Sequence, residues 1–244
     1  MNQLFQPSLV INHVVYWWRV LNQQPVIGFR VDGTPVPLPT ASPQEVDVSD
    51  QNLHKVNLSS LCSNLRYLSL SRNRLTTIDL SPLAHQPQIR QLNLSHNQLE
   101  QINLEPLTHC PNLLVLSLTD NQLSTISLSP LQFCPNLEIL LLDFNQLTSV
   151  DLTPLEHCSR LSHLQLDLNF LQSVDLTPLR HCSALEVLHL ASNQLQSIDL
   201  TPLVELPKLE VVYISFNPGL GSLVPTKDFS FSLVSGDRLG PRPY

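Results

Sequence analysis

Residues 137–160 read LEILLLDFNQLTSVDLTPLEHCSR, and residues 161–184 read LSHLQLDLNFLQSVDLTPLRHCSA. The two stretches align in register, and their leading leucines lie 24 residues apart. The same step separates seven aliphatic residues along the chain, which are Leu65, Ile89, Leu113, Leu137, Leu161, Leu185 and Leu209. One such unit cannot bury its apolar side chains alone. Self-similarity at a fixed period of this length therefore predicts a stacked repeat protein.

The repeated pattern is L-x-x-L-x-L-x-x-N-x-L-x-x-I/V-x-L-x-P-L, and it covers roughly residues 43–223. It resembles the leucine-rich-repeat family, whose motif is L-x-x-L-x-L-x-x-N/C-x-L. The resemblance implies an α/β repeat fold, namely a right-handed solenoid or horseshoe with a concave parallel β-sheet. It also implies, commonly, a role in binding other proteins.

The residues of one unit predict its local structure. Apolar side chains alternate with period two around Leu140 and Leu142, as in a strand with one buried face. Ile139 and Leu141 then point outward, and about eight such strands form the concave sheet. The following Thr153-Pro154-Leu155-Glu156 predicts a short 3₁₀ or α turn on the convex side, with Thr as N-cap, Pro at N1 and Glu completing a capping box.

The ends of the chain depart from the repeat. Residues 1–42 are predicted to form a β-type cap, because they contain β-branched residues, Trp17, Trp18 and the hairpin dipeptide Asp32-Gly33. Residues 43–223 form the repeats. Residues 224–244 are predicted to form a C-terminal cap and tail, in which a closing strand is suggested by Phe229, Phe231 and Leu233.

Three residue types recur at fixed repeat positions. The asparagines are predicted to be structural, turning inward to satisfy loop backbone, and a polar binding stripe is the alternative; they are Asn73, Asn97, Asn121, Asn145, Asn169, Asn193 and Asn217. The cysteine column is predicted to pack in the core, with metal or disulfide chemistry as the alternative; it comprises Cys62, Cys110, Cys134, Cys158 and Cys182. The histidine column is predicted to be structural, because a histidine near the end of a short helical turn is favourable with the helix dipole, and a proton switch or a metal site is the alternative; it comprises His85, His109, His157 and His181.

The outward strand positions are the ones that the repeat leaves variable. Early units carry small polar residues there, and from Val115 onward the surface becomes apolar and is edged by Asp120, Asp143 and Asp167. An apolar centre with a polar rim is typical of protein interfaces, although strands also favour such residues for their own stability. We predict partner-binding residues at Tyr67, Val115, Ile139, Leu141, Asp143, His163, Asp167, Val187, His189 and Tyr213.

Charge is distributed unevenly along the repeats. Residues 113–212 hold eleven acids and three bases, which disfavours a nucleic-acid partner. The residue after each leading aliphatic changes from basic to acidic along the horseshoe, a gradient that can orient a partner or remain solvated surface; the column reads Arg66, Arg90, Leu114, Glu138, Ser162, Glu186 and Glu210.

The sequence predicts a binding module and not an enzyme. It contains no Gly-rich phosphate loop, no G-x-S-x-G and no H-E-x-x-H motif, and its polar residues recur with the repeat. We expect no metal, no cofactor and no membrane partner. We expect a protein or peptide ligand, with a monomer favoured. The five cysteines and the absence of a recognisable signal peptide suggest a cytoplasmic location. The alternatives are a regulatory subunit of a phosphatase or ubiquitin-ligase type enzyme, and a secreted or surface recognition protein.

Overall fold

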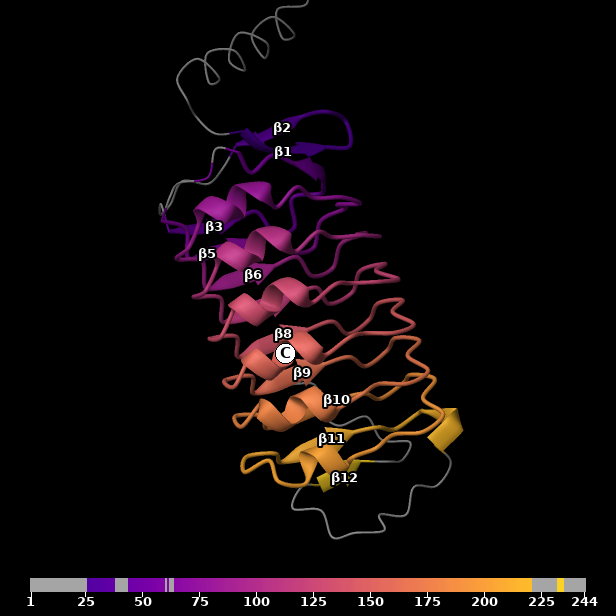
Figure 1. The fold of residues 1–244 in the computed structure, drawn as a ribbon. Coiled ribbons are helices and arrows are strands. Elements are labelled where there is room, and N and C mark those ends of the chain that lie inside the picture. The colour runs from indigo at the N-terminus through magenta and orange to yellow at the C-terminus, as the bar shows by residue number, and fades with distance from the viewer. Residues whose placement is uncertain (1–25, 38–43, 60, 62–63, 221–231, 235–244) are drawn as a thin grey trace, which may run out of the picture.

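The computed structural model describes residues 26–37, 44–59, 61, 64–220 and 232–234, and it is a solenoid of stacked repeats (Figure 1). The axis of the solenoid runs from the indigo N-terminal elements to the yellow C-terminal elements, and each repeat contributes one strand to a common sheet (Figure 1). This is the leucine-rich-repeat fold that the repeat period predicts.

The sheet has nine parallel strands in the order β12-β11-β10-β9-β8-β7-β6-β5-β3. Equivalent repeat positions pair directly, as in Val115↔Ile139 and Ile139↔His163. The register therefore follows the repeat itself. The strands are β3 (Glu45–Asp47), β5 (Tyr67–Ser69), β6 (Gln91–Asn93), β7 (Val115–Ser117), β8 (Ile139–Leu141), β9 (His163–Gln165), β10 (Val187–His189), β11 (Val211–Tyr213) and β12 (Ser232–Val234).

The last strand of the sheet does not come from a repeat. β12 adds parallel to β11, with Leu233 opposite Val212, and it gives the sheet one strand more than the eight that the repeat predicts. Phe229 and Phe231, which were predicted to share this strand, lie outside the described residues. Ser232 is exposed, while Leu233 is only half-buried and packs against the core.

Short 3₁₀ helices form the convex side. They are η1 (Ser81–His85), η2 (Glu105–His109), η3 (Ser129–Phe133), η4 (Thr153–His157), η5 (Thr177–His181), η6 (Thr201–Leu203) and η7 (Pro218–Leu220). η1 to η6 lie on the other side of the core from the sheet, whereas η7 directly follows Asn217 and lies apart from this row, against Leu195 and Gln196 (Figure 1). Proline near the start of η1 to η6 fixes φ for helix entry, and the next proline or polar segment prevents a longer helix.

The predicted capping box is wrong. Leu152 occupies the N-cap position of η4, Thr153 is the first helical residue, and no side-chain cap hydrogen bond forms. The backbone N–H of Thr153 instead donates to Asp151 Oδ1 at 2.9 Å, which is an Asx turn that precedes the helix. The same contact joins Asp175 to Thr177 and Asp199 to Thr201. The capping oxygen therefore belongs to the residue two positions upstream of the one that propensity favours.

The core is a continuous spine of leucine between the sheet and the 3₁₀ helices. Leu140 and Leu142 have no exposed surface, as their alternation predicts. Leu155 of η4 closes the same layer from the convex side and is also fully buried. Because equivalent leucines in successive repeats contact one another, each repeat buries the apolar face of its neighbour.

The N-terminal end carries a second, smaller sheet. β1 (Val26–Arg30) pairs antiparallel with β2 (Pro35–Pro37) through a turn at Asp32-Gly33, where Gly33 has φ of +79°. β1 also pairs antiparallel with β4 (Leu53–Val56) of the first repeat, a contact that the sequence did not reveal. Trp17 and Trp18, predicted members of the cap, lie outside the described residues. Within the described ranges, no helix has the length and apolar character needed to cross a membrane.

Candidate functional site

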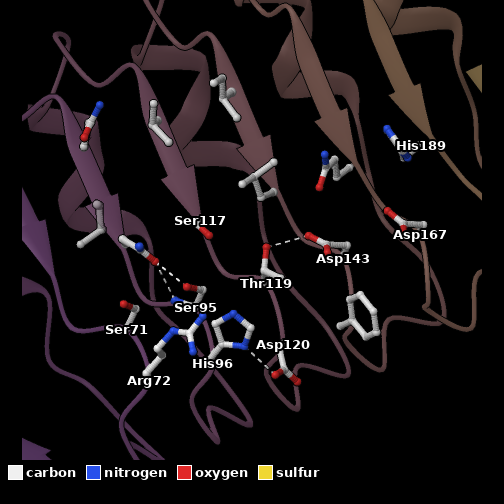
Figure 2. Close-up of a pocket in the computed structure, with 18 of the residues that line it drawn as sticks. Ser71, Arg72, Ser95, His96, Ser117, Thr119, Asp120, Asp143, Asp167 and His189 are labelled. Atoms are coloured by element: carbon white, nitrogen blue, oxygen red, sulfur yellow. Dashed lines mark hydrogen bonds and ion pairs between the residues drawn. The ribbon is translucent and has the colours of Figure 1, made fainter. Parts of the chain in front are cut away.

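The concave face of the solenoid contains a groove of about 810 Å³ (Figure 2). The groove crosses strands β5 to β10, so its lining is drawn from six successive repeats. Its lining residues are Tyr67, Ser71, Arg72, Gln91, Leu92, Asn93, Ser95, His96, Val115, Ser117, Thr119, Asp120, Ile139, Leu141, Asp143, Phe144, Gln165, Asp167 and His189. Because the repeat core fixes every strand, these side chains are presented on a rigid scaffold.

The structure brings most of the predicted partner-binding residues into this groove. Seven of them line it, namely Tyr67, Val115, Ile139, Leu141, Asp143, Asp167 and His189. The other three lie on the same sheet face in β9, β10 and β11 but do not line the groove; they are His163, Val187 and Tyr213. Tyr213 stacks against His189 with ring centroids 4.4 Å apart and an interplanar angle of 24°. It therefore buttresses a lining residue from the adjacent strand.

The floor of the groove is polar at the carboxyl ends of the strands. One position there is occupied by a small residue in most repeats and is largely buried; its occupants are Ser71, Ser95, Thr119, Asp143, Asp167, Ala191 and Ser215. Asp143 is 7% exposed and Asp167 is 9% exposed. The sequence predicted these two carboxylates as part of an exposed rim. That prediction is wrong, because this position faces the groove below its rim, and only Asp120 is exposed.

Hydrogen bonds hold the polar floor in place. Thr119 Oγ1 donates to Asp143 Oδ1 at 2.6 Å, which ties the ends of two adjacent repeats together (Figure 2). In the N-terminal part of the sheet the hydroxyls of Ser49 and Ser69 lie 2.6 Å apart, and Ser71 Oγ donates to Ser49 Oγ at 2.9 Å. Every fully buried side-chain nitrogen or oxygen in the described part of the chain has a hydrogen-bond partner. The floor is thus preorganised before any ligand arrives.

His189 stands at the C-terminal end of the groove. Burial lowers the pKa of its imidazole below the ordinary value of 6.5, although the Asp143 carboxylate raises that pKa and His163 lowers it. Burial is the largest of these effects. The neutral ring is therefore favoured near neutral pH, where it offers one donor and one acceptor beside the Tyr213 ring.

The rim of the groove is formed by four residues, of which the sequence pattern predicted only Asp120. Arg72, His96, Asp120 and Phe144 occupy the position directly before each ladder asparagine, and all have a left-handed backbone with φ between 53° and 54°. This turn lets each backbone N–H reach the next repeat, as when His96 N–H donates to Thr119 O at 2.8 Å. The sequence gives little sign of this turn, because none of the four residues is Gly or Asn, the types that most often adopt a left-handed conformation.

The charge of this rim changes along the solenoid axis. His96 Nδ1 lies 2.7 Å from Asp120 Oδ2, joining adjacent repeats in an exposed ion pair when the imidazole is protonated (Figure 2). Arg72 lies one repeat before His96, at the N-terminal end of the groove. Phe144 follows Asp120 and supplies an aromatic wall to the C-terminal half. The rim is therefore cationic at one end and carboxylate-bearing and aromatic toward the other.

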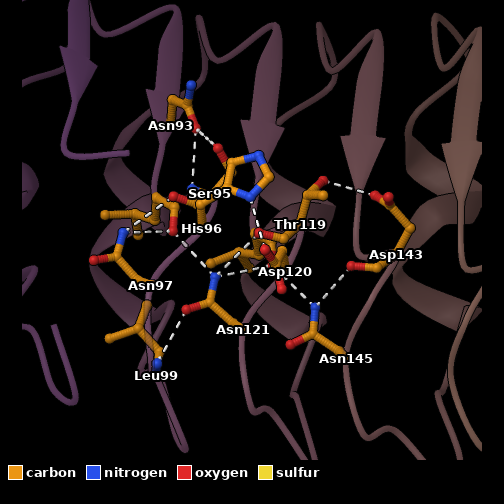
Figure 3. A network of polar contacts seen from close by, with 12 residues as sticks. Asn93, Ser95, His96, Asn97, Leu99, Thr119, Asp120, Asn121, Asp143 and Asn145 are labelled. Atoms are coloured by element: carbon orange, nitrogen blue, oxygen red, sulfur yellow. Dashed lines mark hydrogen bonds and ion pairs between the residues drawn. The ribbon is translucent and has the colours of Figure 1, made fainter. Parts of the chain in front are cut away.

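Behind the groove, the seven asparagines form a buried hydrogen-bond ladder. Figure 3 shows its part at Asn97, Asn121 and Asn145. Asn145 Oδ1 accepts the Leu123 N–H at 3.1 Å, and its Nδ2 donates to Leu118 O at 2.9 Å and to Leu142 O at 3.1 Å. The other ladder residues repeat this pattern, in which the amide of each side chain bridges its own loop and the loop of the preceding repeat. The ladder satisfies backbone and is not available to a ligand.

The cysteine column lies in the core. Four of its members have no exposed surface and are free thiols, namely Cys110, Cys134, Cys158 and Cys182; Cys62 lies outside the described residues. Cys110 Sγ donates to Leu83 O at 3.5 Å. Burial raises the pKa of the Cys110 and Cys158 thiols to about 11 and of the Cys134 and Cys182 thiols to about 12. These thiols are therefore protonated at neutral pH.

The histidine column lies at the ends of η1, η2, η4 and η5, and all four side chains are exposed. His157 Nε2 lies 3.4 Å from Glu156 Oε1 in the same turn. Among the residues that the structure describes, no group of three or more His, Cys, Asp or Glu is arranged to hold a metal ion. The groove on the opposite face is thus the best-formed candidate site.

A family model described as "Leucine rich repeat" matches residues 44–99, 87–147 and 159–218, which together make up well over half of the chain. These ranges include all the strands that line the groove. No curated protein matches the sequence significantly.

Solved structures show the same architecture. Internalin C2 of Listeria monocytogenes superimposes with a TM-score of 0.63 and 29% identity, over 78% of this chain and 80% of that chain. A leucine-rich-repeat protein of Leptospira interrogans gives a TM-score of 0.58 and 26% identity, over 65% of this chain and 39% of that chain. The functional domain of InlJ from Listeria monocytogenes, described as including a cysteine ladder, gives 0.56 and 20%, over 79% of this chain and 44% of that chain. At that identity the likeness to InlJ shows the fold alone. The chain spans less than half the length of the last two proteins.

Proposed function

The chain belongs to the leucine-rich-repeat family, and from that premise we propose that it is a non-catalytic recognition module whose concave groove binds a segment of another protein. The observation that carries the proposal is the groove itself, because its apolar strip, its polar floor and its rim lie at positions that the repeat leaves free to vary. Leucine-rich-repeat proteins generally act as interaction modules, and the groove gives this chain a surface on which to do so.

The chemistry of the groove suits a protein ligand. Val115, Ile139 and Leu141 form a half-buried apolar strip across the two neighbouring strands β7 and β8. The Tyr213–His189 stack and the Phe144 ring add aromatic surface at the C-terminal end. Aromatic and aliphatic anchors surrounded by polar groups are the usual composition of a protein-binding hot spot.

The rigidity of the strands and loops that carry the groove side chains also favours binding in the groove. The groove side chains are mounted on strands that are paired on both sides, and the asparagine ladder fixes the loops below them. Little side-chain or loop ordering is then needed on association, which lowers the free-energy cost of binding. The polar residues recur with the repeat, whereas catalysis requires a unique cluster, and we therefore propose no catalytic role.

A displayed library of random peptides of about ten residues tests the proposal. Such peptides are long enough for the roughly 24 Å from β5 to β10 at about 3.3 Å per residue. The library is selected on the native protein, and enriched peptides are then measured on a groove variant that combines Leu141→Ala, His189→Ala and Tyr213→Ala. We expect Kd to weaken by at least about tenfold in the groove variant, since these changes remove anchor side chains.

The matched control is a triple variant of the convex face, Phe133→Ala, His157→Ala and His181→Ala, whose side chains are all exposed. Its peptide affinities are expected to equal those of the unmodified protein. Thermal unfolding of both variants shows that the fold is intact. Peptides that bind the groove variant as tightly as the native protein would place the binding site elsewhere and refute the proposal.

A further inference from the structure

Two buried carboxylates in the groove are not required by the repeat. Asp143 and Asp167 occupy a position that other repeats fill with serine, threonine or alanine, including Ser95, Ala191 and Ser215. The fold of those repeats is the same, so the position itself accepts a small neutral side chain. Placing a carboxylate there costs desolvation free energy that serine or alanine does not incur. The hydrogen bond from Thr119 Oγ1 to Asp143 offsets part of that cost, and the repeat structure itself requires neither carboxylate.

The two carboxylates lie next to each other. β8 and β9 pair in register, with Leu141 opposite Gln165, so Asp143 and Asp167 follow paired residues on adjacent strands roughly 5 Å apart. Both side chains face the groove (Figure 2). The field of Asp143 extends to His189, whose pKa it raises against the lowering by burial. Two adjacent carboxyl groups therefore form the floor of the C-terminal half of the groove.

The charge of the groove also differs between its two ends. Of the lining residues that the structure describes, Arg72 alone carries a permanent positive charge, and it lies at the N-terminal end. Three repeat steps separate Arg72 from the position of Phe144, a distance of about 14 Å along the axis. Arg66 and Arg90 are exposed beside the same N-terminal strands, while Glu186 and Glu210 flank the C-terminal strands. Charge thus changes sign from one end of the groove to the other.

Apolar and aromatic side chains border the two carboxyl groups of the floor. Ile139 and Leu141 lie on the strand that leads to Asp143, and Phe144 follows it directly. A basic side chain has an aliphatic stem that packs on apolar surface and a cationic end that a carboxylate pair or an aromatic ring attracts. Arginine fits best, because its planar guanidinium can bond two carboxylates at once.

We propose that the groove docks a segment of another protein that carries an arginine or lysine between apolar residues, with the cationic group over Asp143 and Asp167. This inference rests on the proposed function and names the chemistry of the partner. The segment runs in one direction, with its basic residue toward β9 and any acidic residue toward Arg72, because the reverse orientation places like charges together.

The test uses the same peptide library and adds two readouts. The first is composition: enriched peptides are expected to contain arginine or lysine flanked by apolar residues more often than the unselected library. The second is the affinity of those peptides for the double variant Asp143→Asn and Asp167→Asn. Asparagine keeps the acceptor oxygen for Thr119 Oγ1, so the local hydrogen bond is retained. We expect Kd to weaken by at least about tenfold and its dependence on salt to diminish.

A matched control removes the same net charge from the convex face through Glu156→Gln and Glu205→Gln, both at exposed positions. Its affinities are expected to change by less than about twofold. If the asparagine variant does not fold, Asp143→Ser and Asp167→Ser replace it, because serine occupies the same position in other repeats. Thermal unfolding distinguishes the roles: a merely structural pair predicts lower stability in the serine variant, whereas a binding pair predicts equal or higher stability with weaker binding.

The outcomes separate this inference from the proposed function. Peptides that are neutral or acidic, yet lose affinity in the Leu141, His189 and Tyr213 variant, would overturn the basic-partner inference and leave groove binding intact. Peptides that respond equally to the groove and convex charge variants would overturn it as well. Peptides that respond to no groove variant would overturn both.

Discussion

Replacing Asn121 and Asn145 by leucine, singly and together, tests how the asparagine ladder stabilises the solenoid. Within the ladder, the carbonyls of Leu70, Leu94, Leu118, Leu142, Leu166 and Leu190 each accept from two successive asparagines, whereas each bonded backbone N–H donates to one asparagine. Leu118 O accepts from Asn121 Nδ2 at 3.1 Å and from Asn145 Nδ2 at 2.9 Å. The Leu123 N–H donates to Asn145 Oδ1 at 3.1 Å. A single substitution therefore removes the partner of a buried N–H but leaves Leu118 O with one donor.

The magnitudes follow from this count. A buried backbone donor left without a partner costs about 1–3 kcal/mol, so each single variant is expected to lose about that much free energy of unfolding. Leucine has the branched shape of asparagine but no polar atom, so it cannot replace the lost hydrogen bonds. In the double variant Leu118 O loses both donors. The double variant should therefore lose about 1–3 kcal/mol more than the sum of the single losses.

Chemical denaturation followed by circular dichroism measures the three free energies and gives the coupling term. The control cycle pairs Asn145→Leu with Asn193→Leu, because Asn193 Nδ2 donates to Leu166 O and Leu190 O and shares no carbonyl with Asn145. That cycle should be additive to within about 0.5 kcal/mol. Additivity of the adjacent pair to the same precision would refute the shared-carbonyl account. If the double variant is partly unfolded in buffer, all variants are measured with an osmolyte such as TMAO, which raises their stability.

Further predictions concern protonation, thiol reactivity and backbone packing. Burial lowers the pKa of His189 in the folded protein, so the unfolded chain binds more protons than the native state as pH falls below the ordinary pKa of 6.5, and stability falls with it. The variant His189→Gln should therefore lose less melting temperature between neutral and mildly acidic pH than the unmodified protein. An unchanged pH profile of the melting temperature would contradict the lowered pKa. The four described core thiols have pKa values of about 11 to 12 and should react with a thiol reagent at neutral pH only after unfolding. Titration with the reagent, with and without denaturant, measures this reactivity. Rapid labelling of the native protein at these cysteines would disprove their burial. In Gly219→Ala the new Cβ would meet Leu195 O at 2.5 Å and Gln196 Cα at 2.6 Å, so the backbone must shift. The free energy of unfolding should fall by about 1–3 kcal/mol. An unaltered melting temperature would show that the backbone of the last repeat shifts without loss of stability.

Much of the fold could be predicted from the repeat alone. The alternation around Leu140 and Leu142 identified the strand and its buried face, and both side chains are fully buried. The start of the 3₁₀ helix was less predictable, since Thr153 has the propensity of an N-cap while Asp151 makes the hydrogen bond. Propensity describes a residue in an average context, and here the preceding turn places the carboxylate closer to the backbone donor. The pairing of β1 with β4 is a contact between segments of unrelated sequence, which no period can reveal.

The candidate site was predicted only in part. The outward residues of β7, β8 and β10 were identified because period two assigns one face of each strand to solvent. The rim residues Arg72 and His96 were missed, because their left-handed turn arises from hydrogen bonds to the next repeat and not from their own preference. Tyr213 was predicted to contact a partner directly, and the structure places it outside the groove lining, stacked on His189.

The sequence by itself determined which residues stack, because a constant period makes every repeat bury its neighbour and leaves the chain one regular way to hide its leucines. It determined the column to which each variable residue belongs, and hence the face on which it lies. Only the tertiary structure decided how deep each column sits. Asp143 and Asp167 line the groove and yet are buried, and that depth depends on how successive repeats are joined in space. Solvation, and with it the strength of a charge, is a property of the assembled surface and is not encoded in any one repeat.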